Sequence, residues 1–257
     1  MVSGEWILPM KRIALVASQK AEFSGLHRKF GEGDAIESPL RYARRVRTGG
    51  VEWLLFADGQ GARAAERACA AIPSAEPIFA LGSVGYCGGT QPRWKRGEVL
   101  LASEVRDRDS GECFECWMPP RQNGMPPNGR ILTVGHVIGA ASEKRRIGES
   151  GVDAVEMEAA AVARFALLQG LRFFALKAVS DLSGEDLEID FNRATREDGS
   201  VRTGSILAQA LCRPWQRLPR LLQLAGAAKL SSKNLGDALA ALFPVNGENE
   251  RDAYGDS

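Results

Sequence analysis

The sequence lacks both an excess of charge of one sign and a long apolar run. Its 33 Lys and Arg residues are balanced by 32 Asp and Glu residues, so the net charge is only +1. Non-specific binding to nucleic acid or to an anionic membrane requires a strong basic field, so neither is expected as a partner. No stretch approaches the roughly 18 consecutive apolar residues of a membrane-spanning helix, and no integral membrane segment is predicted. The first nine residues also lack the basic and apolar regions of a secretory signal.

Histidine and cysteine are scarce, with two and five residues respectively. An odd number of thiols in a mid-sized chain is more typical of reduced cysteines than of a disulfide framework, which predicts a cytoplasmic protein. Cys113 and Cys116 have the spacing of a metal hook, but no second Cys or His pair follows nearby. Structural zinc requires about four ligands, so no metal site is predicted.

What the chain does contain is an alternation of apolar strands and helices. Strands are predicted at 12–17, 77–82, 97–105, 131–138 and 171–179, and a hairpin at 40–47 and 51–57. Helices are predicted through Leu26 and Phe30 and at 62–72, 142–148, 159–168, 202–212, 215–228 and 233–242. This pattern predicts a single α/β domain over 10–245, with a mixed, mostly parallel central sheet flanked by helices. The polar, acidic tail 246–257 is expected to be disordered.

Three segments lie where such sheets bind ligands, beyond the carboxyl ends of their strands. The glycine-rich segment 82–89 follows one predicted strand, and Ser180-Asp181 ends another. Between them, Val155-Glu156-Met157-Glu158 opens the helix at 159–168. The sequence therefore predicts one site built from three distant parts of the chain.

In this order and spacing, the chain resembles the superfamily of nucleoside phosphorylases and methylthioadenosine/S-adenosylhomocysteine nucleosidases. The resemblance runs from Ile13 to about Asp181, and Ser180 follows Glu158 by 22 residues. It implies a partly barrel-like sheet, a small-molecule nucleoside substrate, and a homo-oligomer that is a dimer or larger. It also implies no resident cofactor, with inorganic phosphate as a possible co-substrate.

Breaking an N-glycosidic bond creates a cationic sugar and a departing base that carries negative charge. Asp181 could protonate that base as a general acid, provided that burial favours its protonated form. Glu158 could accept hydrogen bonds from two ribose hydroxyls and stabilise the cation, while Met157 offers an apolar surface to the sugar. An acidic residue in the first helical turn can instead simply complement the helix dipole, and this alternative applies to Glu156 and Glu158 alike.

The resemblance assigns further roles. Glu22 falls on the acidic residue that helps the nucleosidases activate water, and Val137 and Ile138 fall on the wall that stacks on the base, although an ordinary strand interior is an alternative. Ser180 and Gly88 are further substrate-binding candidates, and backbone N–H groups around Gly88 could approach an anion. His136 is expected to be structural.

Two departures from the family bear on phosphate binding. Tyr86 stands where a small hydroxyl residue is common, and Lys177 stands where Arg is common; Lys lacks the bidentate fork of Arg. Both residues are predicted to line the site in altered form. The basic residues Arg41, Arg44, Arg45 and Arg47 are expected to form a solvated face, with one of them reaching a phosphate or carboxylate as the alternative.

Several functions remain open from sequence. Hydrolysis of an adenine-type nucleoside is favoured, because Glu22 matches the nucleosidases and Tyr86 disturbs the phosphate segment. The alternatives are phosphorolysis, as in purine nucleoside phosphorylases or the phosphorylases associated with hopanoid synthesis, and nucleoside binding without catalysis. A nicotinamide oxidoreductase would depend only on the glycine pattern of 59–64, and no acidic residue follows the next strand to bind a ribose.

Overall fold

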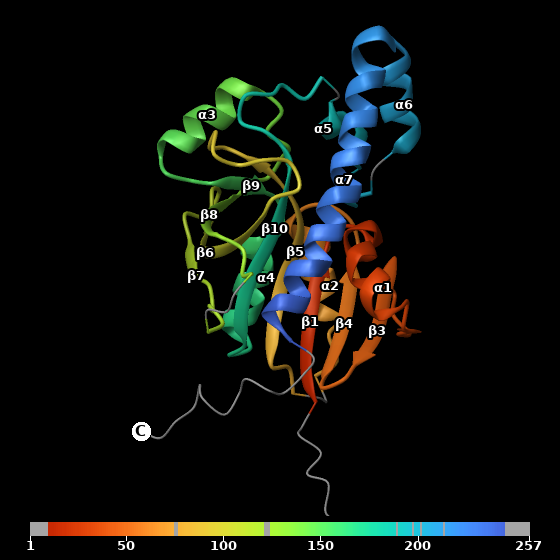
Figure 1. Cartoon of the computed structure of the whole chain (residues 1–257), viewed down its shortest axis with the longest axis vertical. Helices are drawn as coiled ribbons and strands as arrows, with labels where there is room; N and C mark the ends of the chain where they lie inside the picture. The colour runs from red at the N-terminus through yellow and green to blue at the C-terminus, as the bar shows by residue number, and fades with distance from the viewer. Residues whose placement is uncertain are drawn as a thin grey trace, which may run out of the picture.

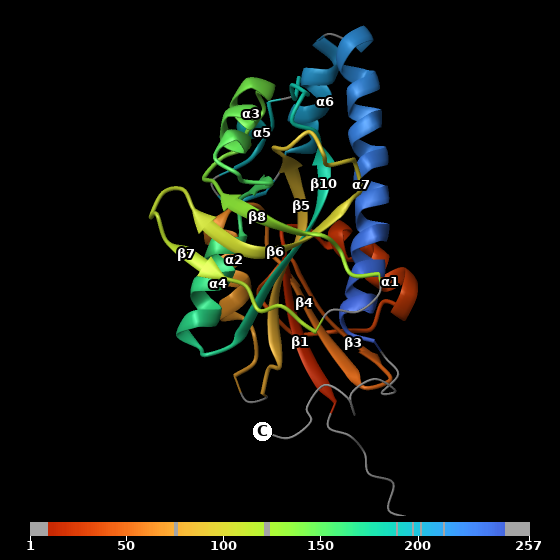
Figure 2. The ribbon, with the colours of Figure 1, turned by 60° about the vertical axis from the view of Figure 1, so that its left-hand side comes forward.

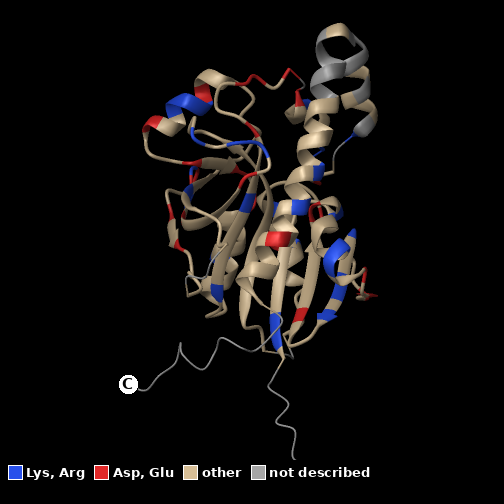
Figure 3. Ribbon diagram, in the orientation of Figure 1, with Lys and Arg blue, Asp and Glu red and all other residues tan. Residues whose placement is uncertain are grey.

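The computed structural model describes residues 10–74, 77–120, 124–188, 190–196, 198–200, 202–212 and 214–244 (Figure 1). The tail predicted at 246–257 lies outside the described residues. Among those that are described, no helix combines the length and apolar character needed to cross a membrane. Lys and Arg are interspersed with Asp and Glu along the ribbon, as the near-zero net charge implies (Figure 3).

Ten strands form one sheet. They are β1 (Lys11–Ala17), β2 (Asp34–Ala35), β3 (Tyr42–Thr48), β4 (Val51–Ala57), β5 (Ala80–Gly89), β6 (Val99–Asp107), β7 (Cys113–Glu115), β8 (Asn128–Thr133), β9 (Ala154–Glu156) and β10 (Arg172–Asp181). The helices are the 3-10 turn η1 (Lys20–Phe23), α1 (Ser24–Phe30), α2 (Ala62–Ala70), α3 (Ala141–Glu149), α4 (Ala159–Leu168), α5 (Phe191–Ala194), α6 (Thr203–Cys212) and α7 (Pro214–Leu242).

The strand order closes part of the sheet into a barrel. The order is β10-β6-β8-β9-β5-β1-β4-β3-β2, and β10 also pairs with β5, so five strands form a ring (Figure 2). The sheet is mixed, and among the described strands the parallel pairings join more residues than the antiparallel ones. The predicted single α/β sheet with a partly barrel-like form is confirmed.

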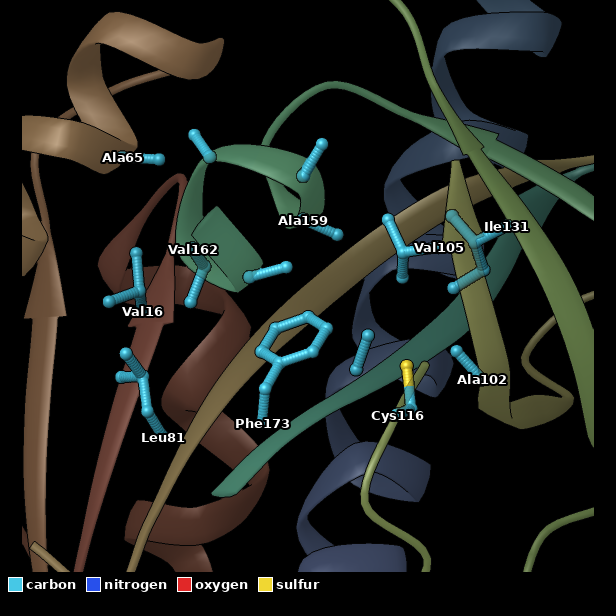
Figure 4. Close-up of a cluster of buried hydrophobic side chains, with 14 of the residues drawn as sticks. Val16, Ala65, Leu81, Ala102, Val105, Cys116, Ile131, Ala159, Val162 and Phe173 are labelled. Atoms are coloured by element: carbon cyan, nitrogen blue, oxygen red, sulfur yellow. The ribbon is translucent and has the colours of Figure 1, made fainter. Parts of the chain in front are cut away.

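Helices cover both faces of this sheet. On one face α2 and α4 bury an Ala-rich surface, and Val162, Phe173 and Ile131 lie in the same apolar cluster (Figure 4). On the other face α1 packs against α7 and β3, and α7 lies over β10, β5 and β6. Short Ala side chains let α4 approach the sheet closely, which positions its N-terminus next to the carboxyl ends of the strands.

Three element boundaries differ from the sequence expectation in ways that affect the site. The strand predicted at 77–82 continues through the glycine-rich segment to Gly89, because that segment pairs with β10 and β9. The strand predicted at 131–138 already ends at Thr133. The two helices predicted at 215–228 and 233–242 are the single helix α7, whose 29 residues run along the barrel (Figure 1).

Candidate active site

A cavity of about 340 Å³ opens at the carboxyl ends of β1, β5 and β10. Its polar wall is formed by Ser18, Gln19, Glu22, Gln60, Tyr86, Gly88, His136, Glu156, Glu158, Ser180 and Asp181. Its apolar wall includes Val134, Val137, Ile138, Val155, Met157, Leu187, Phe191, Leu224, Ala225 and Ala228. The three segments singled out in the sequence thus meet in one cavity, since the strands that carry them end at the same edge of the barrel.

Asp181 is the last residue of β10 and lies in register with Gly88 of β5. Its side chain is buried, and its Oδ2 forms an ion pair with the Nζ of Lys144. The Ser180 hydroxyl lies 2.7 Å from Asp181 Oδ1 and 3.1 Å from the Cys87 carbonyl oxygen, and can donate its one proton to either. A Cβ on Gly88 would lie 3.1 Å from Asp181 Oδ2, so glycine leaves room for the carboxyl group.

Glu22 is buried in η1, and its carboxylate accepts hydrogen bonds from two strand ends. Oε2 accepts from the backbone N–H of Ser18 at 2.8 Å, from the Ser18 hydroxyl at 2.9 Å and from the Gln19 N–H at 2.9 Å. Oε1 accepts from the backbone N–H of Tyr86 at 3.1 Å. One backbone donor of the glycine-rich segment, the Tyr86 N–H, is therefore occupied by the protein's own carboxylate rather than left for an external anion.

Glu158 is the N-cap residue of α4 rather than a residue inside the helix. Its Oε1 accepts a hydrogen bond of 2.7 Å from the N–H of Gly61, which begins α2 with a φ of 88°. The glycine turn at 59–61 therefore positions a site carboxylate. Burial, and then the charge of Glu156, raise the pKa of Glu158 to about 7.

Glu156 ends β9, and its carboxylate caps α4. It accepts from the N–H groups of Glu158 at 3.1 Å and Ala159 at 2.9 Å, and from the Thr133 hydroxyl at 2.6 Å. Lys177 Nζ lies 2.9 Å from Glu156 Oε2, with both side chains almost fully buried. The helix-dipole alternative thus describes Glu156, while Glu158 is free to face the cavity.

Lys177 is not among the residues that line the cavity, contrary to its assignment as a substrate-binding residue. Burial opposes its charge, but the carboxylates of Glu156 and Glu158 outweigh that effect and raise the pKa of the ammonium. Its role in this geometry is to neutralise Glu156 below the cavity wall.

Three comparisons bear on this geometry. A family model described as the phosphorylase superfamily matches residues 126–211, the stretch that contains Glu158 and Asp181. The matched stretch is about a third of the chain. No curated protein sequence shows a significant match to it.

Several solved structures share the fold of this chain at low sequence identity. A Neisseria meningitidis 5'-methylthioadenosine/S-adenosylhomocysteine nucleosidase matches with a TM-score of 0.64 at 18% identity, covering 91% of this chain and 100% of that one. The Campylobacter jejuni nucleosidase matches with a TM-score of 0.63 at 19% identity, with the same coverage. A Helicobacter pylori futalosine hydrolase matches with a TM-score of 0.62 at 14% identity, again over 91% and 100%. At this level of sequence identity, the three structures show a shared fold.

Tyr86 lines the cavity but directs its hydroxyl towards α7. The hydroxyl donates to the Ala228 carbonyl oxygen at 3.1 Å or hydrogen-bonds with the Ser232 hydroxyl. Burial raises the pKa of the phenol to about 12, so it stays protonated at physiological pH. Through these hydrogen bonds, the phenol on β5 holds α7 against that strand.

Val137 and Ile138 lie in the segment between β8 and α3, not in a strand interior, and both line the cavity. This segment is held to α5: the Val137 N–H donates to Asn192 Oδ1 at 2.8 Å, and Asn192 Nδ2 donates to the Val137 carbonyl oxygen at 3.0 Å. They are positioned as one apolar wall of the site, while Met157 forms another part of it.

A second cavity of about 650 Å³ adjoins the first and shares Ser18, Gln19, Gln60 and Phe191 with it. Its wall is basic, with Lys20, Arg41 and Arg196, although Arg41 pairs with Asp198 at 2.9 Å. Of the other basic residues on β3, Arg45 and Arg47 lie outside this cavity and pair with the buried Glu52. The alternative of a carboxylate contact within the chain thus applies to these arginines.

Sequence reasoning missed Lys144, which is fully buried. It looked like part of a charged surface helix, Ser142-Glu143-Lys144-Arg145-Arg146. A signal did exist: position 144 shares one helix face with Ala141, Ile147 and Gly148, all of which are buried.

Proposed function

We propose that the protein hydrolyses the N-glycosidic bond of a purine nucleoside of the adenine type, releasing the free base. Cleavage breaks the C1′–N9 bond, and its electron pair leaves with the base. A proton from the Asp181 carboxyl group goes to N7 of the base, which then departs as a neutral molecule. Water adds to C1′ and gives its proton to Glu22, so atoms and charge balance.

The remaining wall residues fit this chemistry. Glu158 projects one carboxylate oxygen beyond its bond to Gly61, where it can accept from ribose hydroxyls and stabilise the cationic sugar. Val137 and Ile138 offer an apolar face to a flat base, and Met157 offers one to the sugar. Ser180 orients Asp181 through its hydroxyl.

The observation that carries hydrolysis over phosphorolysis is the position of Glu22. Its carboxylate takes the backbone N–H donors of Ser18, Gln19 and Tyr86, which a bound phosphate would otherwise use. Among the described residues that line this cavity there is no Lys or Arg, whereas four carboxyl groups do line it. A phosphate dianion would be repelled there, but a neutral water molecule would not.

The test is product analysis with methylthioadenosine, S-adenosylhomocysteine, adenosine and inosine, each with and without phosphate. We expect base release at a rate that does not depend on phosphate, with free ribose or a 5′-substituted ribose as the second product. Asp181→Asn and Glu22→Gln should each lower kcat by about 10²–10⁴-fold, the range of general acid–base catalysis. Binding of these nucleosides without base release would instead make the protein a non-catalytic nucleoside-binding protein.

Phosphorolysis is the second candidate, and the basic wall of the adjoining cavity favours it. Lys20 and Arg196 could hold a phosphate next to Ser18 and Gln19, at the border of the two cavities. A ribose 1-phosphate product that disappears in Lys20→Ala would establish this alternative.

The same cavity offers room for a 5′ substituent, so we propose that the substrate's 5′ group extends into it.

Homo-oligomer formation and a cytoplasmic location remain predictions of the family resemblance and the composition. Light scattering on the purified full chain measures the first of these directly. No resident cofactor is proposed, and metal-free preparations are expected to be fully active after treatment with a chelator.

A further inference from the structure

The most unusual group near the proposed active site is a lysine with no exposure to solvent. Lys144, in the first turns of α3, has a relative exposure of 0% and ion-pairs with Asp181 Oδ2. Its other ammonium protons point to the carbonyl oxygens of Glu185 at 3.1 Å and Leu182 at 3.3 Å. All three donors of the ammonium group are therefore used.

Lys144 is placed to act through Asp181 rather than on a ligand. Asp181 lines the cavity and Lys144 does not, so the carboxyl group stands between the ammonium and any bound base. Within the described residues, no other carboxylate lies within ion-pair distance of Lys144; Glu185 pairs through its side chain with Arg96. Lys144 and Asp181 thus form an isolated pair.

Burying a lysine costs several kcal/mol unless its charge is compensated. The Ser180 hydroxyl already lies within hydrogen-bond distance of Asp181, so orientation alone does not require a buried cation. In an ion pair with Lys144, the Asp181 carboxylate carries no proton of its own to give to a leaving base. The pair as a whole nevertheless holds one transferable proton, on the ammonium.

We propose that Lys144 supplies the proton that Asp181 delivers to the leaving base. As the C1′–N9 bond breaks, the base becomes strongly basic. A proton then moves from Nζ to the Asp181 carboxyl group and from there to N7. Lys144 is left as a neutral amine and Asp181 as a carboxylate. The proton that Glu22 takes from water restores the ammonium through solvent, so no other reactant is needed.

This inference rests on the proposed nucleoside cleavage and is tested with two leaving groups on one sugar. Methylthioadenosine needs a proton on its base, whereas 4-nitrophenyl 5-methylthio-β-ribofuranoside releases a stable phenolate without one. We expect Lys144→Met to lower kcat/KM for methylthioadenosine by about 10²–10⁴-fold and to change that for the nitrophenyl riboside by less than about threefold. Lys233→Met, at an exposed surface lysine, is the control and should leave both unchanged.

Lys144→Arg separates proton supply from charge alone, because arginine keeps its positive charge but cannot be deprotonated in proteins. We expect this variant to lose as much activity on methylthioadenosine as Lys144→Met. Wild-type activity in Lys144→Arg would overturn the proposal, and so would an equal loss on both probes in either variant. If the unmodified protein cleaves only methylthioadenosine, the activity of Lys144→Arg on methylthioadenosine alone supports or overturns the proposal. Failure of the unmodified protein to cleave either probe would count against the proposed function instead.

Discussion

At the scale of single residues, the cavity combines four carboxyl groups in distinct environments. Glu22 is held by backbone donors, Glu156 by Lys177 and a helix N-terminus, and Asp181 by Lys144. Glu158 accepts a hydrogen bond from the Gly61 N–H and has the like charge of Glu156 nearby. Such separated environments let neighbouring carboxyl groups take different protonation states at one pH.

Glu158 should therefore impose a pH dependence on turnover. Its pKa of about 7, raised by burial and by Glu156, means that it becomes anionic only as the pH rises through neutrality. We expect kcat/KM to rise with pH and level off above about 7, because the anion is the form that stabilises the cationic sugar. In Glu158→Gln this rise of kcat/KM with pH should vanish, together with most of the activity. A rise that persists unchanged in the glutamine variant would refute the assignment.

Gly85 should be irreplaceable for a steric reason. Its φ is 143°, and a Cβ there would come within 2.6 Å of Glu22 Oε1. We expect Gly85→Ala to displace the Glu22 carboxylate and to lower kcat by about 10²-fold, the effect of a misplaced catalytic group. Gly111→Ala is the control, because its φ is also positive, at 75°, but nothing lies within 4 Å of the added Cβ. Equal activity in the two variants would contradict this account.

At the scale of elements, the site depends on how α7 is attached to β5. The Tyr86 hydroxyl forms hydrogen bonds with the α7 backbone and Ser232. The Ser232 hydroxyl in turn lies 2.9 Å from the Ala21 carbonyl oxygen in η1. Helix, strand and the Glu22 turn are thus connected through two side chains. The phenol fixes the helix over the cavity instead of filling an anion site.

Tyr86→Phe should show whether the phenol holds α7 in place or fills an anion site. Removing the hydroxyl should cost about 1 kcal/mol of unfolding free energy, the usual net contribution of one hydrogen bond. The bond from the Tyr86 backbone N–H to Glu22 remains, so turnover without phosphate should stay within a few-fold of the wild type. Urea unfolding and a phosphate titration measure both effects. The appearance of phosphate-dependent turnover would show that the phenol had been excluding an anion.

The sequence predicted some elements and residues better than others, for physical reasons. Local apolar patterns located β1, α4 and β10, and the strand ends placed Asp181 and Glu158 in one region. The continuity of α7 was missed because polar and apolar residues alternate without a clear period near Ser231 and Ser232, which face the barrel. Lys144 was missed because the burial of a charge depends on a partner 37 residues away, which no local pattern reveals.

At the scale of the whole molecule, two buried carboxyl groups give stability opposite dependences on pH. Glu52 accepts from arginines on β1 and β3; burial disfavours its charge, but the Arg12 and Arg47 bonds prevail and lower its pKa. This contribution is present above the pKa of an unfolded Glu and is lost as the pH falls through the lower folded value. Glu158 has the opposite effect. Because its pKa is raised in the folded state, it stabilises the fold fully at a pH below about 4.5, and this contribution is lost as the pH rises to about 7.

We therefore expect Glu52→Gln to destabilise the fold at neutral pH. The variant should also lose less stability than the wild type as the pH falls. The cost should be about 2 kcal/mol, below that of a fully buried ion pair because its arginine partners are partly exposed. Thermal unfolding between pH 3 and pH 8 measures both effects. Glu32→Gln is a surface control, and a similar loss of stability in that variant would contradict the role of the Glu52 cluster.

Helix α7 contributes side chains to the wall of the cavity but none of the groups proposed to react. Leu224, Ala225 and Ala228 line the cavity from this one helix, whereas the proposed acid, base and sugar-binding carboxylates all precede residue 182. Exchanging three side chains on a single helix would thus redirect the proposed activity towards bulkier or more polar nucleosides while the reacting groups stay in place. A library randomised at these three positions would leave the bond-breaking apparatus untouched and would be a compact starting point for altering selectivity.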